Sequence, residues 1–218
     1  MIVSKDKLFI SFIVFIQFMS FSIASHSTQY VTYGSVLKIL NVDYNVRLHS
    51  HDVKYGTGSG QQSITGTELK EDINSHWAIL NVTNSAYIRG KPIKCGDVIR
   101  LQHLSTNKNL HSHHFSSPLS GNQEISCYGE EGIGDSGDHW KVVCSDDFWL
   151  RSYGVKFQHI DTEVYLSVSG RTFGRPINGQ MEIVGLTNSY KSTEWKAAEG
   201  IFVHPSSEPA RKAEHTEL

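Results

Sequence analysis

Apolar and polar residues alternate along three short stretches of the chain: SVLKILNV at 35–42, DVIRLQHL at 97–104 and GVKFQHI at 154–160. Alternation with a period of two is typical of β-strands that have one buried face. A turn-prone patch follows each stretch. Between residues 31 and 201 no segment of convincing length has the period of a helix, although 67–74 has room for one helical turn. The pattern therefore predicts an all-β domain.

Three landmarks recur along the chain in the same order. A leucine is followed by a tryptophan 29, 30 and 29 positions later, in the pairs Leu48 with Trp77, Leu110 with Trp140, and Leu166 with Trp195. A matched segment lies midway in each unit, with the sequences QSITG, QEISC and MEIVG. A glycine precedes each leucine by 12 to 14 residues, at Gly34, Gly96 and Gly154. Such spacing predicts an internal repeat.

Three units of about four strands each cannot bury an apolar face alone, so they are expected to share one core. Propellers usually have four to eight blades. We therefore predict that the units close around a threefold axis as a β-trefoil. Large aromatics at matching positions more often pack than bind, so the three tryptophans and three leucines are assigned to the core. The predicted repeats are 28–84, 88–146 and 147–203.

The composition is typical of a globular protein and does not indicate a strongly charged binding partner. Of the 218 residues, 39% are hydrophobic and 19% are charged. The 20 Lys and Arg residues nearly balance the 22 Asp and Glu residues, which gives a net charge of −2. This balance gives no reason to expect binding to nucleic acid or to an anionic membrane.

The first 24 residues have the features of a signal peptide. Lys5 and Lys7 precede an apolar run at 8–23, and small residues at positions 22 and 24 suit cleavage. The run is shorter than the ~20 residues that span a bilayer. A cleaved signal peptide at 1–24 is the favoured interpretation, an uncleaved anchor is the alternative, and no other membrane span is expected.

The chain ends in a polar, proline-containing segment at 204–218, which we expect to be flexible. Its last four residues are His215, Thr216, Glu217 and Leu218. Retrieval signals of the endoplasmic reticulum end in K-D-E-L or H-D-E-L, so the match is three of four. A signal peptide directs entry into the secretory route and a retrieval tail returns a protein to the endoplasmic reticulum. Together they predict a location in the lumen of the endoplasmic reticulum.

Three cysteines and one glycosylation sequence complete the covalent features. Cys95 lies just before the first strand of repeat two and Cys144 just after its tryptophan strand. These ends should lie close together in a closed unit, so a Cys95–Cys144 disulfide is predicted. Cys127 is expected to be buried and free. Asn81 opens an Asn-Val-Thr acceptor sequence for N-glycosylation.

Two long phrases give the sequence a family resemblance: VRLHSHDVKYGTGSGQQSITG at 46–66 and NLHSHHFSSPLSGNQEIS at 109–126. With EVYLSVSG, FGRPINGQ and WKAAEGIF in repeat three, the chain resembles the stromal cell-derived factor two family, built from three MIR repeats. The resemblance covers 31–203. It implies a soluble lumenal β-trefoil without catalysis that works in protein quality control. The implied partners are a lumenal J-domain co-chaperone and, through it, the lumenal heat-shock ATPase, together with misfolded clients.

Histidines of repeat two are candidate metal ligands. On a strand His111 and His113 share one face while His114 points the other way, with His103 nearby in sequence. Zinc sites need three or four convergent ligands, and the spacing identifies no further one. Structural histidines are the favoured interpretation, and neither a metal nor a cofactor is expected.

Two glycine-rich segments are candidate ligand-binding loops. GTGSG at 56–60 has no following lysine and opens no helix, so it is not a phosphate loop. EEGIGDSGD at 130–138 lacks the spacing of a calcium loop, which leaves a solvated acidic loop as the favoured interpretation. No nucleophile motif or positioned acid–base pair selects an active site, and an enzyme is not expected.

The leading hypothesis is a binding module that docks the J-domain co-chaperone and holds clients. Loops on a rigid scaffold often carry binding, and Tyr153, Phe173 and Arg175 are the first candidates. The alternative is a glycan-binding lectin or an accessory factor of protein O-mannosylation, because trefoils commonly hold sugars and MIR repeats occur in mannosyltransferases. The lectin-type Q-x-W triplet is absent, since His76, His139 and Glu194 precede the three tryptophans.

Overall fold

The computed structural model describes residues 29–205 except 84, 87 and 178. The predicted signal peptide and the retrieval tail at 215–218 therefore lie outside the described residues. Twelve strands within them form one antiparallel sheet, four in each repeat. The strands are β1 (Val36–Asn41), β2 (Arg47–Lys54), β3 (Gln62–Thr67), β4 (Trp77–Asn81), β5 (Val98–His103), β6 (Asn109–Ser116), β7 (Gln123–Tyr128), β8 (Trp140–Val143), β9 (Lys156–His159), β10 (Tyr165–Thr172), β11 (Met181–Leu186) and β12 (Trp195–Ile201). A short 3-10 turn precedes the fourth strand of each repeat: η2 (Ile73–Ser75), η3 (Ser136–Asp138) and η4 (Lys191–Thr193).

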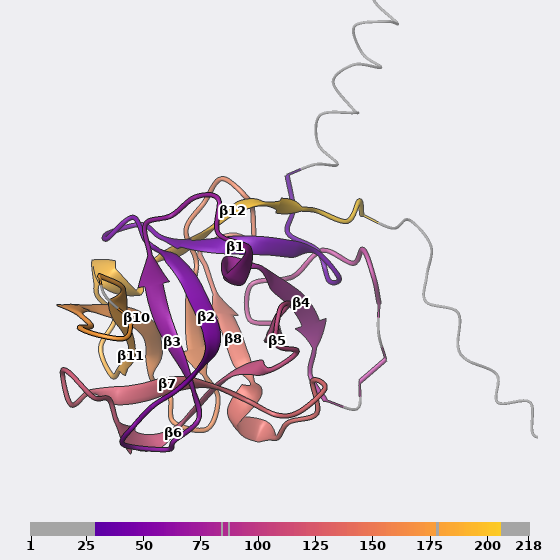
Figure 1. Cartoon of the computed structure of the whole chain (residues 1–218). Coiled ribbons are helices and arrows are strands. Elements are labelled where there is room, and N and C mark those ends of the chain that lie inside the picture. Colours follow the sequence, from indigo (N-terminus) through magenta and orange to yellow (C-terminus); the bar gives the residue numbers. More distant parts are fainter. Residues whose placement is uncertain (1–28, 84, 87, 178, 206–218) are drawn as a thin grey trace, which may run out of the picture.

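The first and fourth strands of the three repeats form a closed barrel. β4 pairs with β1 and β5, β8 pairs with β5 and β9, and β12 pairs with β1. A bridge between Val155 and Trp195 closes the ring. The second and third strands form hairpins that pair with one another through β3, β7 and β11 and cap one end of the barrel (Figure 1). This architecture confirms the predicted β-trefoil.

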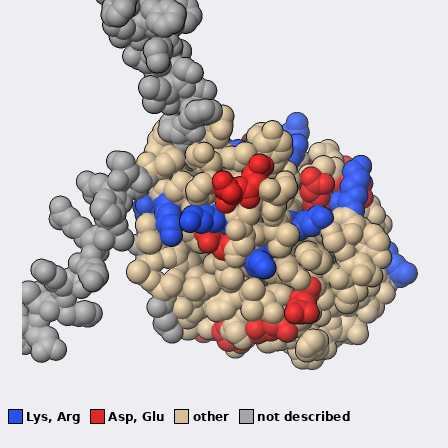
Figure 2. Space-filling model, turned by 180° about the vertical axis from the view of Figure 1, so that it is seen from behind, with Lys and Arg blue, Asp and Glu red and all other residues tan. Residues whose placement is uncertain are grey.

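Charges of both signs are mixed on one face of the molecule. On the face shown in Figure 2, Lys and Arg side chains lie among Asp and Glu side chains. One ion pair joins the cap to the barrel: Arg47 of β2 contacts both carboxylate oxygens of Glu199 of β12. The Arg47 contacts hold the pKa of the Glu199 carboxyl at about 2, well below its usual range.

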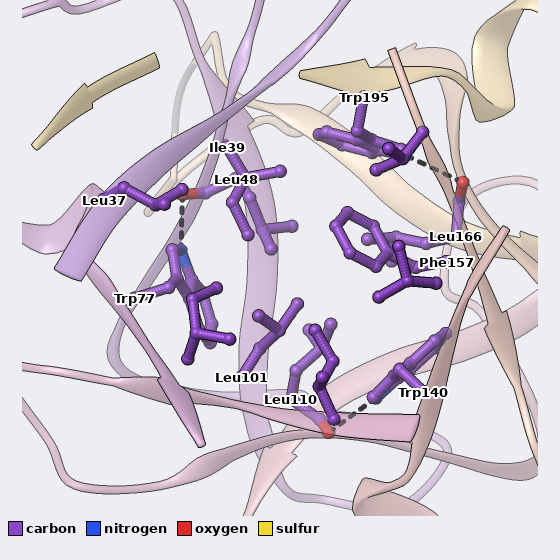
Figure 3. Close-up of a cluster of buried hydrophobic side chains, with 14 of the residues drawn as sticks. Leu37, Ile39, Leu48, Trp77, Leu101, Leu110, Trp140, Phe157, Leu166 and Trp195 are labelled. Atoms are coloured by element: carbon purple, nitrogen blue, oxygen red, sulfur yellow. Dashed lines mark hydrogen bonds between the residues drawn. The ribbon is translucent and has the colours of Figure 1, made fainter. Parts of the chain in front are cut away.

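The three repeated tryptophans fill the core, as predicted, and each is fully buried. Every one of their indole Nε1–H groups donates to the carbonyl of the paired leucine at 2.9 Å (Figure 3). The leucine lies in the second strand of its repeat and the tryptophan begins the fourth strand. This bond therefore ties the cap hairpin to the barrel, and it explains the spacing of 29 or 30 residues.

A ring of backbone hydrogen bonds closes the other end of the barrel. Val31 donates to Trp149, Trp149 donates to Ile93, and Ile93 donates back to Val31, at 2.9, 2.9 and 3.0 Å. All three side chains are fully buried. One residue from the segment ahead of each repeat's first strand thus contributes to a threefold seal.

Each first strand also fixes the 3-10 turn of the repeat before it. Asn41 Nδ2 donates to the Ser192 carbonyl at 2.7 Å. His103 Nε2 lies 2.8 Å from the Asn74 carbonyl, and His159 Nε2 lies 2.8 Å from the Gly137 carbonyl. The Nδ1 atoms of both histidines face threonine hydroxyls at 2.8 Å. Burial lowers the pKa of His103 to about 4 and also lowers that of His159, so both rings are neutral donors near pH 7.

A disulfide joins Cys95 to Cys144, with Cα atoms 5.4 Å apart. It connects the segment before β5 to the segment after β8 and so ties repeat two at the end of the barrel opposite the cap. Cys127 on β7 is buried and free. Burial raises the pKa of its thiol to about 12, which keeps it in the unreactive thiol form at neutral pH.

The Trp140 hydrogen bond can be tested by Trp140→Phe. The change leaves a cavity and also leaves the buried Leu110 carbonyl without its donor. Trp149→Phe is the matched control, because Trp149 is equally buried but its Nε1 has no partner in the described part of the chain. We expect Trp140→Phe to lower the free energy of unfolding in guanidinium titrations by about 1–3 kcal/mol more than the control does. Equal losses would show that the bond adds no stability.

The His103 contact predicts a pH-dependent stability. An unfolded histidine binds a proton below about pH 6.5, whereas folded His103 binds one only below about pH 4. The contribution is thus fully present above pH 6.5 and is lost as the pH falls toward 4, by up to about 1.4 kcal/mol per pH unit. His103→Asn should reduce the slope of unfolding free energy against pH in this window. Its stability near pH 7 should remain, because Asn41 already fills this role in repeat one; an unchanged slope would refute the assignment.

Candidate functional site

Histidines of β2 and β6 contact aspartates of the 3-10 turns, and these contacts are the main polar clusters of the fold. In repeat one His49 Nδ1 lies 2.7 Å from Asp72 Oδ2, and His49 Nε2 lies 2.8 Å from His51 Nδ1. Asp72 caps η2 by accepting from Asn74 N at 3.3 Å, and it also accepts from the Ser75 hydroxyl. Both nitrogens of His49 are therefore satisfied.

The pKa values of this cluster follow from burial and from these partners. Burial raises the pKa of the Asp72 carboxyl, but hydrogen bonds from Ser75 and His49 outweigh it, so the pKa lies below its ordinary value. Burial lowers the pKa of His51, and repulsion by His49 lowers it further. Asp72 is thus a stable anion beside His49, and His51 accepts a proton less readily than an exposed histidine does.

Repeat two rebuilds the cluster with a second acid. The segment DSGDHW at 135–140 matches DINSHW at 72–77, so Asp135 stands at the position of Asp72 and Asp138 at that of Ser75. The fully buried Asp138 lies 2.8 Å from His111 Nδ1 and accepts from Asn109 Nδ2 at 2.9 Å. The solvated-loop interpretation of 130–138 is therefore wrong for Asp138, which the turn η3 carries inward.

Asp135 and His113 gather beside the same ring. Asp135 Oδ1 lies 3.7 Å from His111 Nδ1, and its side chain is half exposed. The ring of His113 packs edge-on against that of His111, with centroids 4.2 Å apart, as the strand pattern predicted. One ligand atom from each of His111, His113 and Asp135 lies within 4.8 Å of the other two. Sequence reasoning missed Asp135, although alignment of the two repeats on their tryptophans would have identified it.

Repeat three lacks this chemistry. Ser167 replaces the first histidine and donates to the Ser192 hydroxyl at 2.9 Å. Tyr190 stands at the position of the capping aspartate. The three repeats therefore share a frame and differ in polar content: one acid with two histidines, two acids with two histidines, and hydroxyl groups.

A shallow groove of about 350 Å³ lies between the hairpins of repeats one and two. Its lining combines two cations with amide and aromatic groups, including Lys54, Lys108, Gln62 and Tyr128. Gln62 Oε1 is buried and has no hydrogen-bond partner among the described residues. The Tyr128 ring lies 4.7 Å from that of His111, so the groove borders the polar cluster of repeat two.

The three residues predicted to bind partners do not form one surface. Tyr153 is 60% exposed in the link between β8 and β9, at the end of the barrel opposite the cap, near the backbone ring that includes Trp149. Phe173 and Arg175 lie in the turn between β10 and β11, in the cap. Phe173 is half-buried and Arg175 is exposed. Two separate candidate surfaces follow, one at each end of the barrel.

Asn81 ends β4 and is partly buried. Its amide nitrogen donates to the Ala86 carbonyl, and its Oδ1 is buried without a partner among the described residues. Glycosylation at Asn81 stays a prediction.

The part of the chain that the structure describes contains no helix long and apolar enough to cross a membrane.

Comparison with known proteins gives a consistent identity. Residues 38–169 match the model of the MIR domain. Human stromal cell-derived factor 2 is 53% identical over 197 residues, which cover 90% of this chain and 93% of that protein. The crystal structure of the SDF2-like protein from Arabidopsis thaliana is 43% identical, with a TM-score of 0.79 over 82% of this chain and 99% of that one.

A more distant likeness supports the fold alone. The designed threefold-symmetric protein ThreeFoil is 12% identical, with a TM-score of 0.51 over 75% of this chain and 98% of that one. The fold thus agrees with a threefold architecture, while the high identities settle the family. The chain belongs to the stromal cell-derived factor 2 family of MIR-domain proteins.

Proposed function

We propose that this chain is a non-enzymatic binding protein of the endoplasmic reticulum lumen. It docks a J-domain co-chaperone, through it associates with the lumenal heat-shock ATPase, and assists the folding of client proteins. The 53% identity with human stromal cell-derived factor 2 over 90% of the chain carries this proposal, because the resemblance to that family implies this role.

The proposed location rests on the two ends of the sequence. The apolar run at 8–23 suits entry into the secretory route, and the last four residues, His215 to Leu218, match a retrieval signal in three of four positions. A tail placed on the lumenal side would be accessible to a retrieval receptor.

The fold suits a docking module because its loops project from a rigid frame. The indole bonds, the backbone ring and the Cys95–Cys144 disulfide tie both ends of the barrel. Near Tyr153, the Arg151 guanidinium stacks 3.6 Å from the Phe202 ring centroid, and its Nε donates to the Tyr30 carbonyl at 3.2 Å. An exposed aromatic beside an ordered cation is a typical composition for an interface centre.

The cap supplies the rival surface, in the turn that carries Phe173 and Arg175. An exposed arginine beside a half-buried aromatic has the same interface character. J-domain docking is assigned to one of these two surfaces, and variants at each end of the barrel distinguish them.

The test is crosslinking and affinity purification of the tagged mature chain from cells, with the last four residues kept at the free C-terminus. Recovery of a J-domain co-chaperone together with the lumenal ATPase is expected. Either Tyr153→Ala or the double change Phe173→Ala with Arg175→Ala should reduce that recovery at least tenfold, about 1.4 kcal/mol of binding free energy. Tyr190→Ala is the matched control, because Tyr190 is similarly exposed but belongs to neither surface.

Two outcomes would contradict the proposal. One is the absence of any J-domain protein under conditions in which the human relative recovers one. The other is recovery of glycoproteins that free mannose releases, which would make the chain a lectin. Secretion of a variant lacking the last four residues, but not of the full chain, would separately support lumenal retrieval.

A further inference from the structure

His111 of β6 has an unusual hydrogen-bonding state. Its side chain is fully buried, and its Nε2 has no hydrogen-bond partner in the described part of the chain. Its Nδ1 is occupied by Asp138 at 2.8 Å, so the Nδ1–H donates to the carboxylate and the Nε2 carries the free lone pair. A buried polar atom without a partner requires an explanation, and a role as a metal ligand is one.

We propose that His111, His113 and Asp135 form a zinc-binding site in repeat two. Imidazole and carboxylate ligands suit Zn²⁺, whereas calcium prefers a shell of oxygens alone. One ring nitrogen of each histidine and one carboxylate oxygen of Asp135 lie within 4.8 Å of one another. Ligands of one tetrahedral zinc ion lie roughly 3.4 Å apart, given bond lengths of about 2.1 Å. Zinc binding requires the half-buried His113 and the half-exposed Asp135 to rotate toward Nε2 of the fixed His111, because Asp135 Oδ1 now lies 3.7 Å from Nδ1 of that ring.

The second layer of contacts already has the form that zinc sites use. A ligating histidine commonly donates its other N–H to a carboxylate, which fixes the tautomer and the orientation of the ring. Asp138 fills this role for His111, and Asn109 Nδ2 holds the other oxygen of Asp138 at 2.9 Å. His111 is therefore oriented before any metal binds.

The turn η3 brings the third ligand close to the ring. Asp135 Oδ1 accepts from the Gly137 N–H at 2.8 Å and so points toward the cluster. A Cβ atom on Gly137 would lie 2.5 Å from His111 Cε1 and 3.1 Å from Asp135 Oδ1. Glycine at this position thus permits the close approach of the turn to the imidazole, and His159 fixes the turn through the Gly137 carbonyl.

Repeat one shows why the site belongs to repeat two. The same His-x-His sequence occurs there, but His49 Nε2 and His51 Nδ1 bond each other at 2.8 Å. The aspartate of its cluster, Asp72, is occupied by His49. In repeat two Asp138 performs the task of Asp72, and this leaves Asp135 available as a ligand. Three protein ligands leave the fourth position of zinc open to water.

The test is calorimetric titration of the untagged mature chain with zinc sulfate, with Co²⁺ as a spectroscopic substitute. One equivalent is expected to bind, and Co²⁺ should give the visible absorption of a four- or five-coordinate site. His113→Ala and Asp135→Asn should each weaken zinc affinity at least tenfold. Both residues are partly exposed, so the variants should fold.

Matched controls locate the ion. His51→Ala changes the equivalent histidine of repeat one, and His114→Ala changes the next residue of β6, which points to solvent. Neither should alter zinc affinity. Zinc should also raise the unfolding temperature of the native chain and of both controls, but not that of His113→Ala. Absence of one-equivalent binding, equal affinity in His113→Ala and Asp135→Asn, or an equal loss in either control would overturn the proposal.

Discussion

The indole hydrogen bond to a strand carbonyl, made three times, is the constraint on which the fold depends. Each bond joins the fourth strand of a repeat, in the barrel, to the second strand, in the cap. The carbonyl is buried and would lose its partner if the tryptophan moved, which costs more than the bond itself contributes. Barrel and cap therefore cannot slide over one another, and the leucine-to-tryptophan spacing is fixed while the residues between them can vary.

Variation between the repeats is concentrated where this frame leaves side chains free. The bond from the first strand to the preceding 3-10 turn comes from Asn41 in one repeat and from His103 and His159 in the others. Amide and imidazole serve equally because each supplies an N–H at the required place. The side chains of the second strand that face the 3-10 turns differ more. They are paired histidines in repeats one and two and a serine, Ser167, in repeat three. Chemistry specific to one repeat thus develops on a frame common to all three.

The strands and the core could be predicted from the sequence, but the polar cluster of repeat two could not. Alternation and the Leu–Trp spacing predicted the strands and the core because both follow from periodic burial. The sequence does not predict that Trp149 belongs to the core. Its threefold equivalents are Val31 and Ile93, and the three residues are linked only by backbone hydrogen bonds, which leave no common side chain for a repeat to reveal. Asp138 was assigned to solvent because it lies among glycines and acids. Its burial depends on a partner 27 residues away, His111, and local composition does not encode that contact.

The same limit applies to the candidate binding residues. Tyr153, Phe173 and Arg175 all lie in loops, as predicted. The topology places Tyr153 at one end of the barrel and the other two residues in the cap at the opposite end. A rigid trefoil cannot bring these ends together, so a partner that contacts one end leaves the other available.

The polar cluster of repeat two lies in a third place, between β6 and η3. The strand β8 begins at Trp140, two residues after this turn, and His159 of the next repeat holds the turn through the Gly137 carbonyl. A ligand bound there would stabilise the joint between barrel and cap without covering either end. Binding at the cluster and docking of a protein partner are therefore separable in this fold, because the frame between them does not need to move for either.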